Sequence, residues 1–425
     1  MLNAEKNRIL TEVGPDTPMG GLLRRYWMPI AGTSEFTEEQ TIKAIRLLGE
    51  DLVLYRDFGG RYGLIDRNCS HRRADLSYGF VEEHGLRCNY HGWLFGENGA
   101  CLSQPYEDVA HPDNRSRERV RIKAYPVQEK GGLLWAYMGP QPEPLLPDYE
   151  AFSRPNGFVQ IVISELPCNW FQCQENSIDP VHFEWIHNNW NIRQQGKRGP
   201  YSAEHREVDF EEFEHGFTYK RVRGDASKED DPLWNIGRVC LWPNALYTGS
   251  HFEWRVPVDD ENTLSICWTY TRVPRESEPY RQDVIPTWHG PIRDRDGRWI
   301  SSHIMNQDFV GWVGQGVIAD RTLENLGASD RGIAMIRKRY FEDLETIAAG
   351  GDPKGIIRDP ALNHCIDLPN VYAQKMKEGA SLETMLNDPI ARRHLEDYIW
   401  QAGQPPEVKA AYLSAMGVPA SRGAE

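Results

Sequence analysis

The chain has 425 residues, 40% apolar and 26% charged, which is typical of a folded soluble protein of two or three domains. The 48 Lys and Arg against 62 Asp and Glu give a net charge of −14, which argues against nucleic acid or an anionic membrane as the main partner. No apolar run reaches the roughly 18 residues that cross a bilayer, and residues 1–10 lack the apolar core of a signal peptide, so we expect a cytoplasmic protein.

The first third of the chain is predicted to form short helices followed by small strands. Residues 3–12 and 20–26 have helical patterns, and the Gly14–Pro15 pair ends the first. From residue 27 to residue 138, short apolar runs alternate with Gly, Asn and Asp, which predicts antiparallel strands. The clearest of these runs are 41–48, 52–57, 62–65 and 132–138.

Residues 139–155 contain five prolines, which excludes this stretch from a sheet or a helix interior and predicts a linker. The pattern after the linker mixes both kinds of element. The expected elements are a strand at 159–166, a helix at 171–188, several strands between 218 and 273, and helices at 310–349 and 382–415. We therefore predict the α+β class, with the domains 1–26 (helical segment), 27–138 (small all-β domain), 139–155 (linker) and 156–425 (larger domain).

Two Cys–His pairs form the densest chemical signal. Cys69 and His71 are followed, after sixteen intervening residues, by Cys88 and His91. A zinc ion could use these two thiolates and two imidazoles, although the common zinc finger groups Cys with Cys and His with His. The alternating order suits two loops that clamp a two-iron cluster, with the cysteines on one iron and the histidines on the other. The six remaining cysteines lack such spacing and are expected to be small buried residues.

The segment 69–93 resembles the Rieske [2Fe–2S] fingerprint, including the trailing Gly92 and Trp93. A Rieske cluster transfers single electrons, so a chain of this length is expected to hold an electron acceptor in its second domain.

The segment 175–187 supplies a candidate acceptor site. Its pattern Asn-x-x-Asp-x-x-His-x4-His contains Asn176, Asp179, His182 and His187. Two His and one carboxylate form the facial triad that holds non-haem Fe(II). His182 and His187 are five residues apart, about 140° around a regular helix, so we predict a wide turn, a π-bulge or a helix end between them.

This pattern resembles the iron site of the Rieske non-haem iron oxygenases, and residues 13–20, 22–27, 306–309 and 314–321 look like the phthalate dioxygenase branch. The resemblance implies a helix-grip (START-like) catalytic domain and makes Asp308 the third iron ligand, with Asp320 as its structural rival. Residues 310–313 are less polar than the branch leads us to expect. Asp179 would bridge His91 of a neighbouring subunit to His182, which implies a homotrimer or a stacked hexamer. Asn176 either lies near the iron or caps the helix.

The resemblance implies an oxygenase component that uses O₂ and a Rieske cluster with mononuclear Fe(II). Electrons would come from NAD(P)H through a separate flavin and iron–sulfur reductase, with or without a ferredoxin. The substrate would be a carboxylated or methoxylated aromatic small molecule, either hydroxylated or oxidatively O-demethylated. The alternatives are cis-dihydroxylation and a non-catalytic Rieske electron carrier. The candidate pocket residues are Trp185, Ile186, Asn189, Trp190, Tyr247 and His251, with Arg193, Arg206 or Arg221 for a carboxylate.

Overall fold

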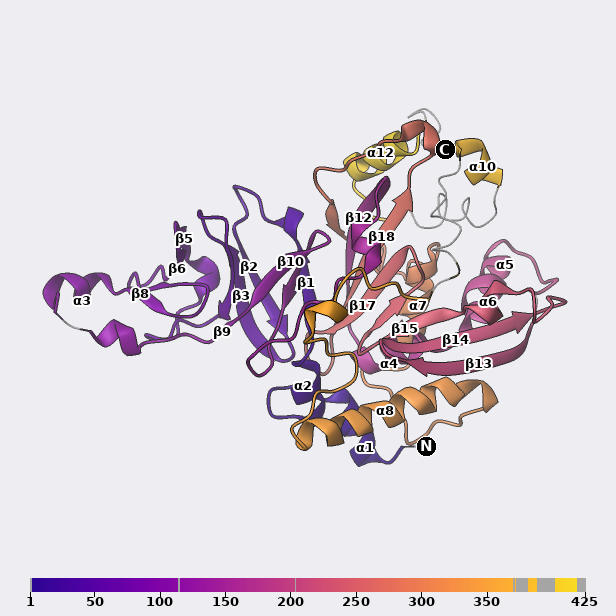
Figure 1. Cartoon of the computed structure of the whole chain (residues 1–425), viewed down its shortest axis with the longest axis horizontal. Coiled ribbons are helices and arrows are strands. Elements are labelled where there is room, and N and C mark those ends of the chain that lie inside the picture. The colour runs from indigo at the N-terminus through magenta and orange to yellow at the C-terminus, as the bar shows by residue number, and fades with distance from the viewer. Residues whose placement is uncertain are drawn as a thin grey trace. The chain divides into compact units, whose positions relative to one another are not determined.

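The computed structural model of this chain describes residues 2–113, 115–202, 204–369, 371, 381–387 and 402–418. The chain folds as two units (Figure 1). The small unit is Val13–Leu146, and the large unit combines Met1–Glu12 with Pro147–Glu425. The predicted boundary at residue 26 lies inside the small unit, because the chain enters that unit directly after helix α1 (Ala4–Thr11).

Three antiparallel sheets build the small unit, in the orders β1-β11-β10, β2-β3-β4-β9 and β5-β6-β7-β8. The turn between β2 and β3 consists of Leu48 and Gly49, both with positive φ, as the tight hairpin connection requires. The strands are β1 (Met28–Gly32), β2 (Ile42–Leu47), β3 (Glu50–Arg56), β4 (Tyr62–Asp66), β5 (Phe80–Glu82), β6 (Gly85–Arg87), β7 (Leu94–Phe95), β8 (Cys101–Ser103), β9 (Ala124–Tyr125), β10 (Val127–Lys130) and β11 (Leu133–Ala136). The four strands predicted here are confirmed.

The core of the small unit lies beneath the two Cys–His loops. Val53, Tyr55 and Ile65 pack in one buried cluster with Cys69 and Cys88. Burial of this apolar surface stabilises the unit and holds the two cysteines of the loops in place. The unit also contains α2 (Pro18–Leu23), capped by Thr17, α3 (Pro105–Ala110) and short 3₁₀ turns.

A single eight-stranded sheet forms the centre of the large unit, in the order β13-β14-β15-β16-β17-β18-β12-β19. Only the pairing of β12 with β19 is parallel among these described strands. The strands are β12 (Gly157–Leu166), β13 (His205–Phe213), β14 (Gly216–Arg223), β15 (Arg238–Leu241), β16 (Ala245–Tyr247), β17 (His251–Pro257), β18 (Thr263–Arg272) and β19 (Thr287–His289). The α+β class is confirmed, and β13 and β19 lie outside the ranges in which strands were predicted.

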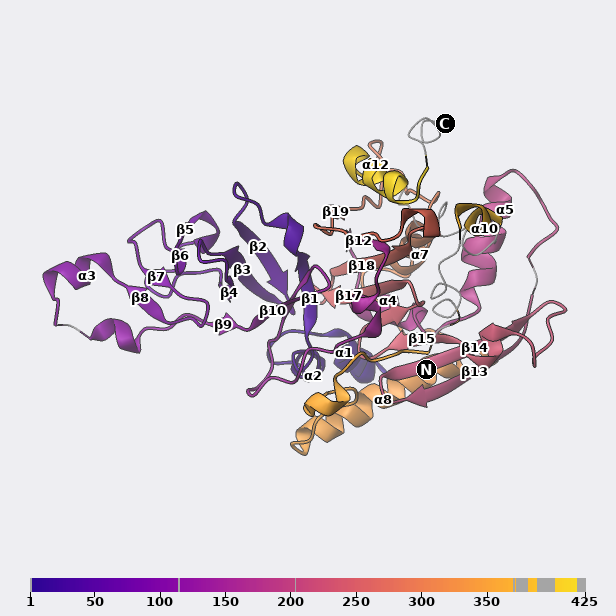
Figure 2. The same ribbon diagram turned by 45° about the horizontal axis from the view of Figure 1, so that its top comes forward.

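Helices flank this sheet (Figures 1 and 2). The core between β12, β18 and the helices contains Phe158, Cys267, Phe309, Trp312 and Tyr412. The helices are α4 (Trp170–Asn176), the π-helix η5 (Phe183–Asn189), α5 (Trp190–Gln194), α6 (Pro232–Asn235), α7 (Ile304–Val313), α8 (Arg331–Ala348), α10 (Leu382–Asn387) and α12 (Pro406–Ala415), with 3₁₀ turns η4 (Glu150–Ser153), η6 (Arg275–Ser277), η7 (Ala328–Asp330) and η8 (Pro360–Leu362).

The predicted helices of this unit were too long. The helix expected at 171–188 is interrupted after Asn176, because the segment before Pro180 leaves the helical conformation. The helix expected at 310–349 is two helices, α7 and α8, since the glycines at 314, 316 and 327 lie between them. Of the helix expected at 382–415, residues 388–401 lie outside the described part. No helix of the described residues is long and apolar enough to cross a membrane.

Candidate metal centres

The two Cys–His loops of the small unit have the same backbone hydrogen bonds. Cys69 donates its N–H to the carbonyl of Ala74, at 2.8 Å, and its own carbonyl accepts from the N–H of Arg73. Cys88 repeats this pattern with the carbonyl of Trp93 and the N–H of Gly92. The fourth residue after each cysteine has positive φ, 62° at Arg73 and 72° at Gly92. Both loops therefore present one Cys and one His in the same way.

The two cysteine and two histidine side chains of these loops lie close together, as the ligands of a two-iron cluster must. Cys69 and Cys88 are buried, and burial together with the neighbouring Cys88 raises the pKa of Cys69 to about 11. Two buried thiols in contact need a cation to ionise, which fits a cluster that binds thiolates. The rings of His71 and His91 lie 4.7 Å apart, and His71 stacks on Trp93. These four residues would hold the [2Fe–2S] cluster.

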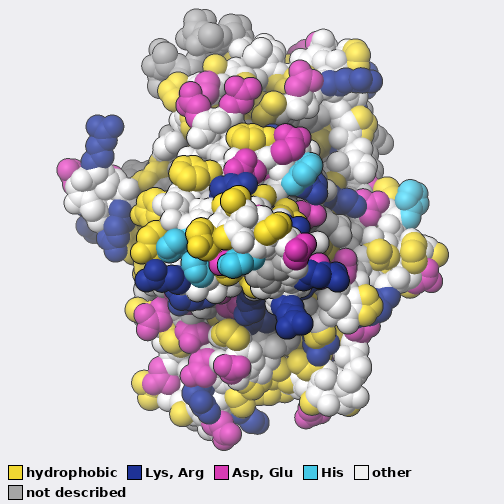
Figure 3. Space-filling model, turned by 90° about the vertical axis from the view of Figure 1, so that its left-hand side faces the viewer, with side chains coloured by type: hydrophobic (Ala, Val, Ile, Leu, Met, Phe, Trp, Pro, Cys, Tyr) yellow, Lys and Arg dark blue, Asp and Glu magenta, His cyan; other side chains and the backbone are white. Residues whose placement is uncertain are grey.

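The histidine side of this site faces the surface. His91 is exposed and His71 is half-buried, beside the exposed ring of Tyr90 and the guanidinium of Arg72. In Figure 3 this end of the small unit presents histidine side chains among hydrophobic and basic ones. The histidine side of a bound cluster would therefore be accessible from the solvent.

In the large unit, a break in the helix separates Asn176 from His182. Pro180 has no N–H to donate, and Asp179 accepts the N–H of Val181 at 2.8 Å, so the chain turns before the next helix begins. From Phe183 to Asn189 the chain is a π-helix that continues into α5 as one helical ribbon (Figure 2). The predicted π-type distortion between His182 and His187 is confirmed. The wider helical turn places the imidazoles of His182 and His187 close to each other.

The structure brings His182, His187 and Asp308 together. The Nε2 atoms of His187 and His182 lie 3.3 and 3.7 Å from Oδ1 of Asp308, and all three ligand atoms lie within 4.8 Å of one another. His187 is buried, and its Nε2 has no hydrogen-bond partner among the described residues. A buried polar atom without a partner is costly. The three donors therefore fit a single Fe(II) in a facial arrangement.

Asp308 is ionised at neutral pH in this setting. Burial raises the pKa of its carboxyl, but the imidazoles of His187 and His182 outweigh burial, so the pKa lies below its ordinary value. The rival Asp320 is exposed, and its carboxylate accepts from the N–H and the hydroxyl of Thr322. It lies outside the histidine cluster.

Three side chains contact the ligand group without belonging to it. Asn176 donates its amide N–H to Oδ1 of Asp308 at 3.2 Å. Asp179 places Oδ2 3.5 Å from Nδ1 of His182. Gln307 lies 3.0 Å from Nδ1 of His187 through its Oε1 atom. Gln307 lies in the segment 306–309, which resembles the phthalate dioxygenase branch. Nothing in the sequence, however, indicates that its side chain contacts His187.

A second group of ligand-type side chains lies on β17 and β18: His251, Glu253 and Cys267. Oε1 of Glu253 accepts from the hydroxyl of Ser265 at 2.6 Å, and Oε2 pairs with Arg255 at 2.9 Å. The positive charge of Arg255 disfavours a cation here. Burial raises the pKa of both Glu253 and Cys267, which also weakens them as anionic ligands. Sequence reasoning did not single out Glu253 or Arg255.

The proposed pocket residues have different surroundings. Of the three candidate arginines, Arg193 and Arg206 are exposed, whereas Arg221 is buried with its guanidinium 4.5 Å from the ring of Phe183. The side chain of Arg238 lies 4.8 Å from the same ring. The remaining candidates divide by exposure: Trp185 is exposed, Ile186 and Trp190 are half-buried, and Asn189, Tyr247 and His251 are buried. Of the cysteines expected to be buried, Cys365 is exposed.

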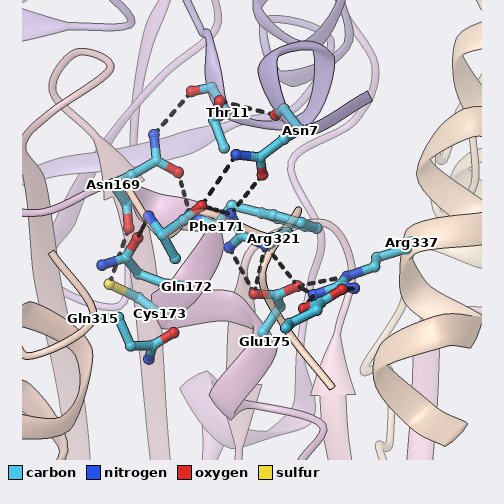
Figure 4. A network of polar contacts seen from close by, with 12 residues as sticks. Asn7, Thr11, Asn169, Phe171, Gln172, Cys173, Glu175, Gln315, Arg321 and Arg337 are labelled. Atoms are coloured by element: carbon cyan, nitrogen blue, oxygen red, sulfur yellow. Dashed lines mark hydrogen bonds and ion pairs between the residues drawn. The ribbon is translucent and has the colours of Figure 1, made fainter. Parts of the chain in front are cut away.

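A buried ionic network anchors α4, the helix that precedes the iron motif (Figure 4). Both oxygens of Glu175 accept from Arg321, and one also accepts from Arg337 at 2.7 Å. Arg321 continues to Oδ1 of Asn7 on α1 at 3.0 Å. A further amide, Gln172, donates to the carbonyl of Trp312 on α7. These contacts tie α4 to α1, α7 and α8.

Comparison with known proteins shows the family of this chain. The Rieske [2Fe-2S] domain matches residues 26–126, and the LigXa C-terminal domain like family matches residues 254–365. The 5,5'-dehydrodivanillate O-demethylase oxygenase subunit of Sphingobium sp. (strain NBRC 103272 / SYK-6) is 58% identical, over 98% of each chain. The phthalate 4,5-dioxygenase oxygenase subunit of Pseudomonas putida is 31% identical, over 82% of this chain and 88% of that one.

Solved structures share the fold. NdmA of Pseudomonas putida CBB5 is 22% identical with a TM-score of 0.56, covering 78% of this chain and 93% of that chain. The terminal oxygenase of carbazole 1,9a-dioxygenase from Novosphingobium sp. KA1 is 20% identical with a TM-score of 0.54, covering 79% and 97%. A Rieske domain and relatives at 58% and 31% identity, which match 98% and 82% of this chain, show that the chain belongs to the oxygenase subunits of the Rieske non-haem iron oxygenases.

Proposed function

We propose that this chain is the oxygenase subunit of an aromatic O-demethylase. The observation that carries the proposal is the 58% identity, over almost the whole of both chains, to a 5,5'-dehydrodivanillate O-demethylase oxygenase subunit. In the reaction, a methyl aryl ether, O₂, two electrons and two protons give a phenol, formaldehyde and water. Bound at His182, His187 and Asp308, Fe(II) supplies the O₂-dependent oxidation.

The chain's own residues position and shield this site. Asp308 and His187 are buried and exclude bulk water from their side of the metal. Asn176 holds Oδ1 of Asp308, and Asp179 faces His182. The protein thereby fixes the donors before substrate binds, which lowers the cost of reaching the reactive arrangement.

A carboxylated substrate suits the positive charge beside the iron motif. The guanidinium groups of Arg221 and Arg238 flank Phe183, the residue after His182, and both arginines are buried. Guanidinium groups recognise carboxylates bidentately, and a low-dielectric setting strengthens that attraction. We therefore favour a methoxylated aromatic acid.

We also propose that Asp179 is an electron bridge between subunits. One carboxylate oxygen faces His182, while the side chain remains 27% exposed, so it can accept a second imidazole from another copy. His91 of a neighbouring subunit is exposed and is the candidate donor. A head-to-tail contact of this kind closes into a homotrimer, alone or stacked as a hexamer. A flavin and iron–sulfur reductase, with or without a ferredoxin, would supply the electrons.

The experiment uses the purified oxygenase with a compatible reductase and NADH. The substrates are 5,5'-dehydrodivanillate, vanillate, the methoxyphenol that lacks the carboxylate of vanillate, and phthalate. We expect one formaldehyde per O₂ consumed with a methoxylated acid and a higher KM with the substrate that lacks the carboxylate. The His187→Ala variant is the control for reductase background. A cis-diol without formaldehyde would instead support the dioxygenase alternative.

A further inference from the structure

We infer that Gln307 is a positioning residue that fixes both the orientation and the proton of the His187 imidazole, so that Nε2 presents its lone pair to the metal. This inference rests on the proposed iron ligands and assigns a role to a side chain that would not itself bind iron. Gln307 is 1% exposed and precedes Asp308 on α7.

The amide of Gln307 can adopt only one orientation. Its Nε2 donates to the backbone carbonyl of Ser301 at 3.0 Å and to Oδ1 of Asn191 at 2.5 Å. A backbone carbonyl only accepts hydrogen bonds, so a flipped amide would set two acceptor oxygens against each other. The oxygen of Gln307 must therefore face the other way, toward His187.

The orientation of the amide then determines the tautomer of His187. Oε1 of Gln307 lies 3.0 Å from Nδ1 of His187, and a carbonyl oxygen has no proton to give. Nδ1 must carry the hydrogen and donate it. A neutral imidazole has a single N–H, and in His187 this N–H is on Nδ1. The Nε2 atom of the neutral ring is therefore unprotonated, 3.3 Å from Oδ1 of Asp308. A lone pair that faces an ionised carboxylate at this distance is unfavourable unless a cation lies between them, either a proton on Nε2 in the metal-free protein or the metal ion.

The two histidines are therefore oriented by different groups. His182 has the carboxylate of Asp179 near its Nδ1, whereas His187 has a neutral amide. A hydrogen-bond acceptor behind a metal-bound imidazole fixes its ring and makes it a better ligand. The neutral amide does this at His187 without adding a negative charge to the site.

The same amide links three elements that the sequence keeps apart. Gln307 belongs to α7, His187 to the π-helix η5, and Asn191 to α5. Asp308, the next residue on α7, faces the same imidazole from its other nitrogen. One short segment of α7 thus provides a metal ligand and the group that orients another, so the two positions are set together.

The test measures Fe(II) affinity with the Rieske cluster in place. Mononuclear iron is removed anaerobically and returned by equilibrium dialysis against Fe(II), for wild type, Gln307→Met, Gln307→Glu and the exposed control Gln315→Met. Met matches Gln in length but cannot accept from Nδ1. Glu retains this acceptor but loses the donor to Ser301 and Asn191, a loss that should lower the unfolding midpoint and not the Fe(II) affinity. We expect Gln307→Met to weaken Fe(II) binding about 10–100-fold, Gln307→Glu to stay within about threefold of wild type, and Gln315→Met to be unchanged.

The unfolding midpoint of the iron-free variants separates positioning from packing. A purely structural role predicts a lower midpoint for Gln307→Met with unchanged Fe(II) affinity, and that result would overturn the inference. An equal loss of affinity in Gln307→Glu would do the same, since the acceptor is still present. If Gln307→Met fails to fold, Gln307→Glu decides the question: binding close to wild type supports the role, and a tenfold loss contradicts it.

His187→Ala shows which statement has failed. If this variant binds Fe(II) like wild type, the ligand assignment itself is wrong. If it loses iron while Gln307→Met retains it, only the role of Gln307 is wrong. Neither result depends on which substrate the enzyme oxidises.

Discussion

Oδ1 of Asp308 lies 3.3 Å from Nε2 of His187, although one residue belongs to a helix before seven strands of the sheet and the other to a helix after them. The proposed iron site therefore depends on the packing of α7 against the π-helix. Ligands from distant segments are joined only when the whole unit has folded, so loss of one ligand should affect the metal more than the fold.

Asp308→Ala should remove the mononuclear iron and leave the Rieske cluster intact. The remaining imidazoles give too few donors to retain Fe(II) firmly, because the carboxylate is the only anionic ligand of the proposed triad. Iron analysis against the visible absorbance of the cluster measures the two centres separately. Asp320→Ala, at the exposed rival position, should keep wild-type iron. Reversed results for the two variants would make Asp320 the ligand.

Asp179→Asn should keep both metal centres and lower turnover roughly 10–100-fold. The amide is the same size as the carboxylate, but it cannot accept from two imidazoles with the strength of a charged group. Steady-state O₂ consumption and single-turnover oxidation of the reduced cluster report the defect. Turnover at the wild-type rate would show that Asp179 is not a bridge.

Glu175→Gln should destabilise the large unit by about 3 kcal/mol, because it leaves the buried guanidinium group of Arg321 without a charged partner, whereas Arg337 keeps its ion pair with Glu324. Urea unfolding followed by tryptophan fluorescence measures the loss. The matched control is Asp352→Asn, which removes a carboxylate from the exposed pair with Arg358 and should change stability by less than about 1 kcal/mol. Equal effects would mean that the network in Figure 4 does not stabilise α4.

Glu50 should make the small unit more stable near neutral pH than in acid. Burial raises the pKa of this carboxyl, but hydrogen bonds from Lys123, Tyr125 and Arg24 outweigh burial and bring it below 4.5. The stabilisation is therefore complete above about pH 4.5 and is lost as the pH falls through the lower folded-state pKa.

Glu50→Gln removes this titration. Compared with wild type, its unfolding midpoint should be lower at pH 7, and the difference should shrink as the pH falls below about 4.5. Thermal unfolding followed by the visible absorbance of the cluster provides the measurement. A difference that stays constant over this range would exclude ionisation of Glu50 as the cause.

Sequence spacing alone determined the local parts of this protein. The two loops that carry Cys69 and Cys88 are closed by hydrogen bonds between residues no more than five positions apart. Their structure therefore depends on short sequence segments and could be predicted from them. The five-residue interval between His182 and His187 likewise predicted a wide turn, a π-bulge or a helix end, and the structure has a π-helix there. The small strands and the α+β class followed from apolar periodicity in the same way.

Only the tertiary structure decided the parts that depend on distant segments. It brought Asp308, rather than Asp320, to the two histidines, and it gave Gln307 its contact with His187. The division of the helix expected at 310–349 is different, because the glycines at 314, 316 and 327 that separate α7 from α8 are already present in the sequence. The periodicity of apolar residues predicts which face of a helix or strand is buried. It does not predict the hydrogen-bond partner of a buried polar side chain, because that depends on which helices and strands pack together.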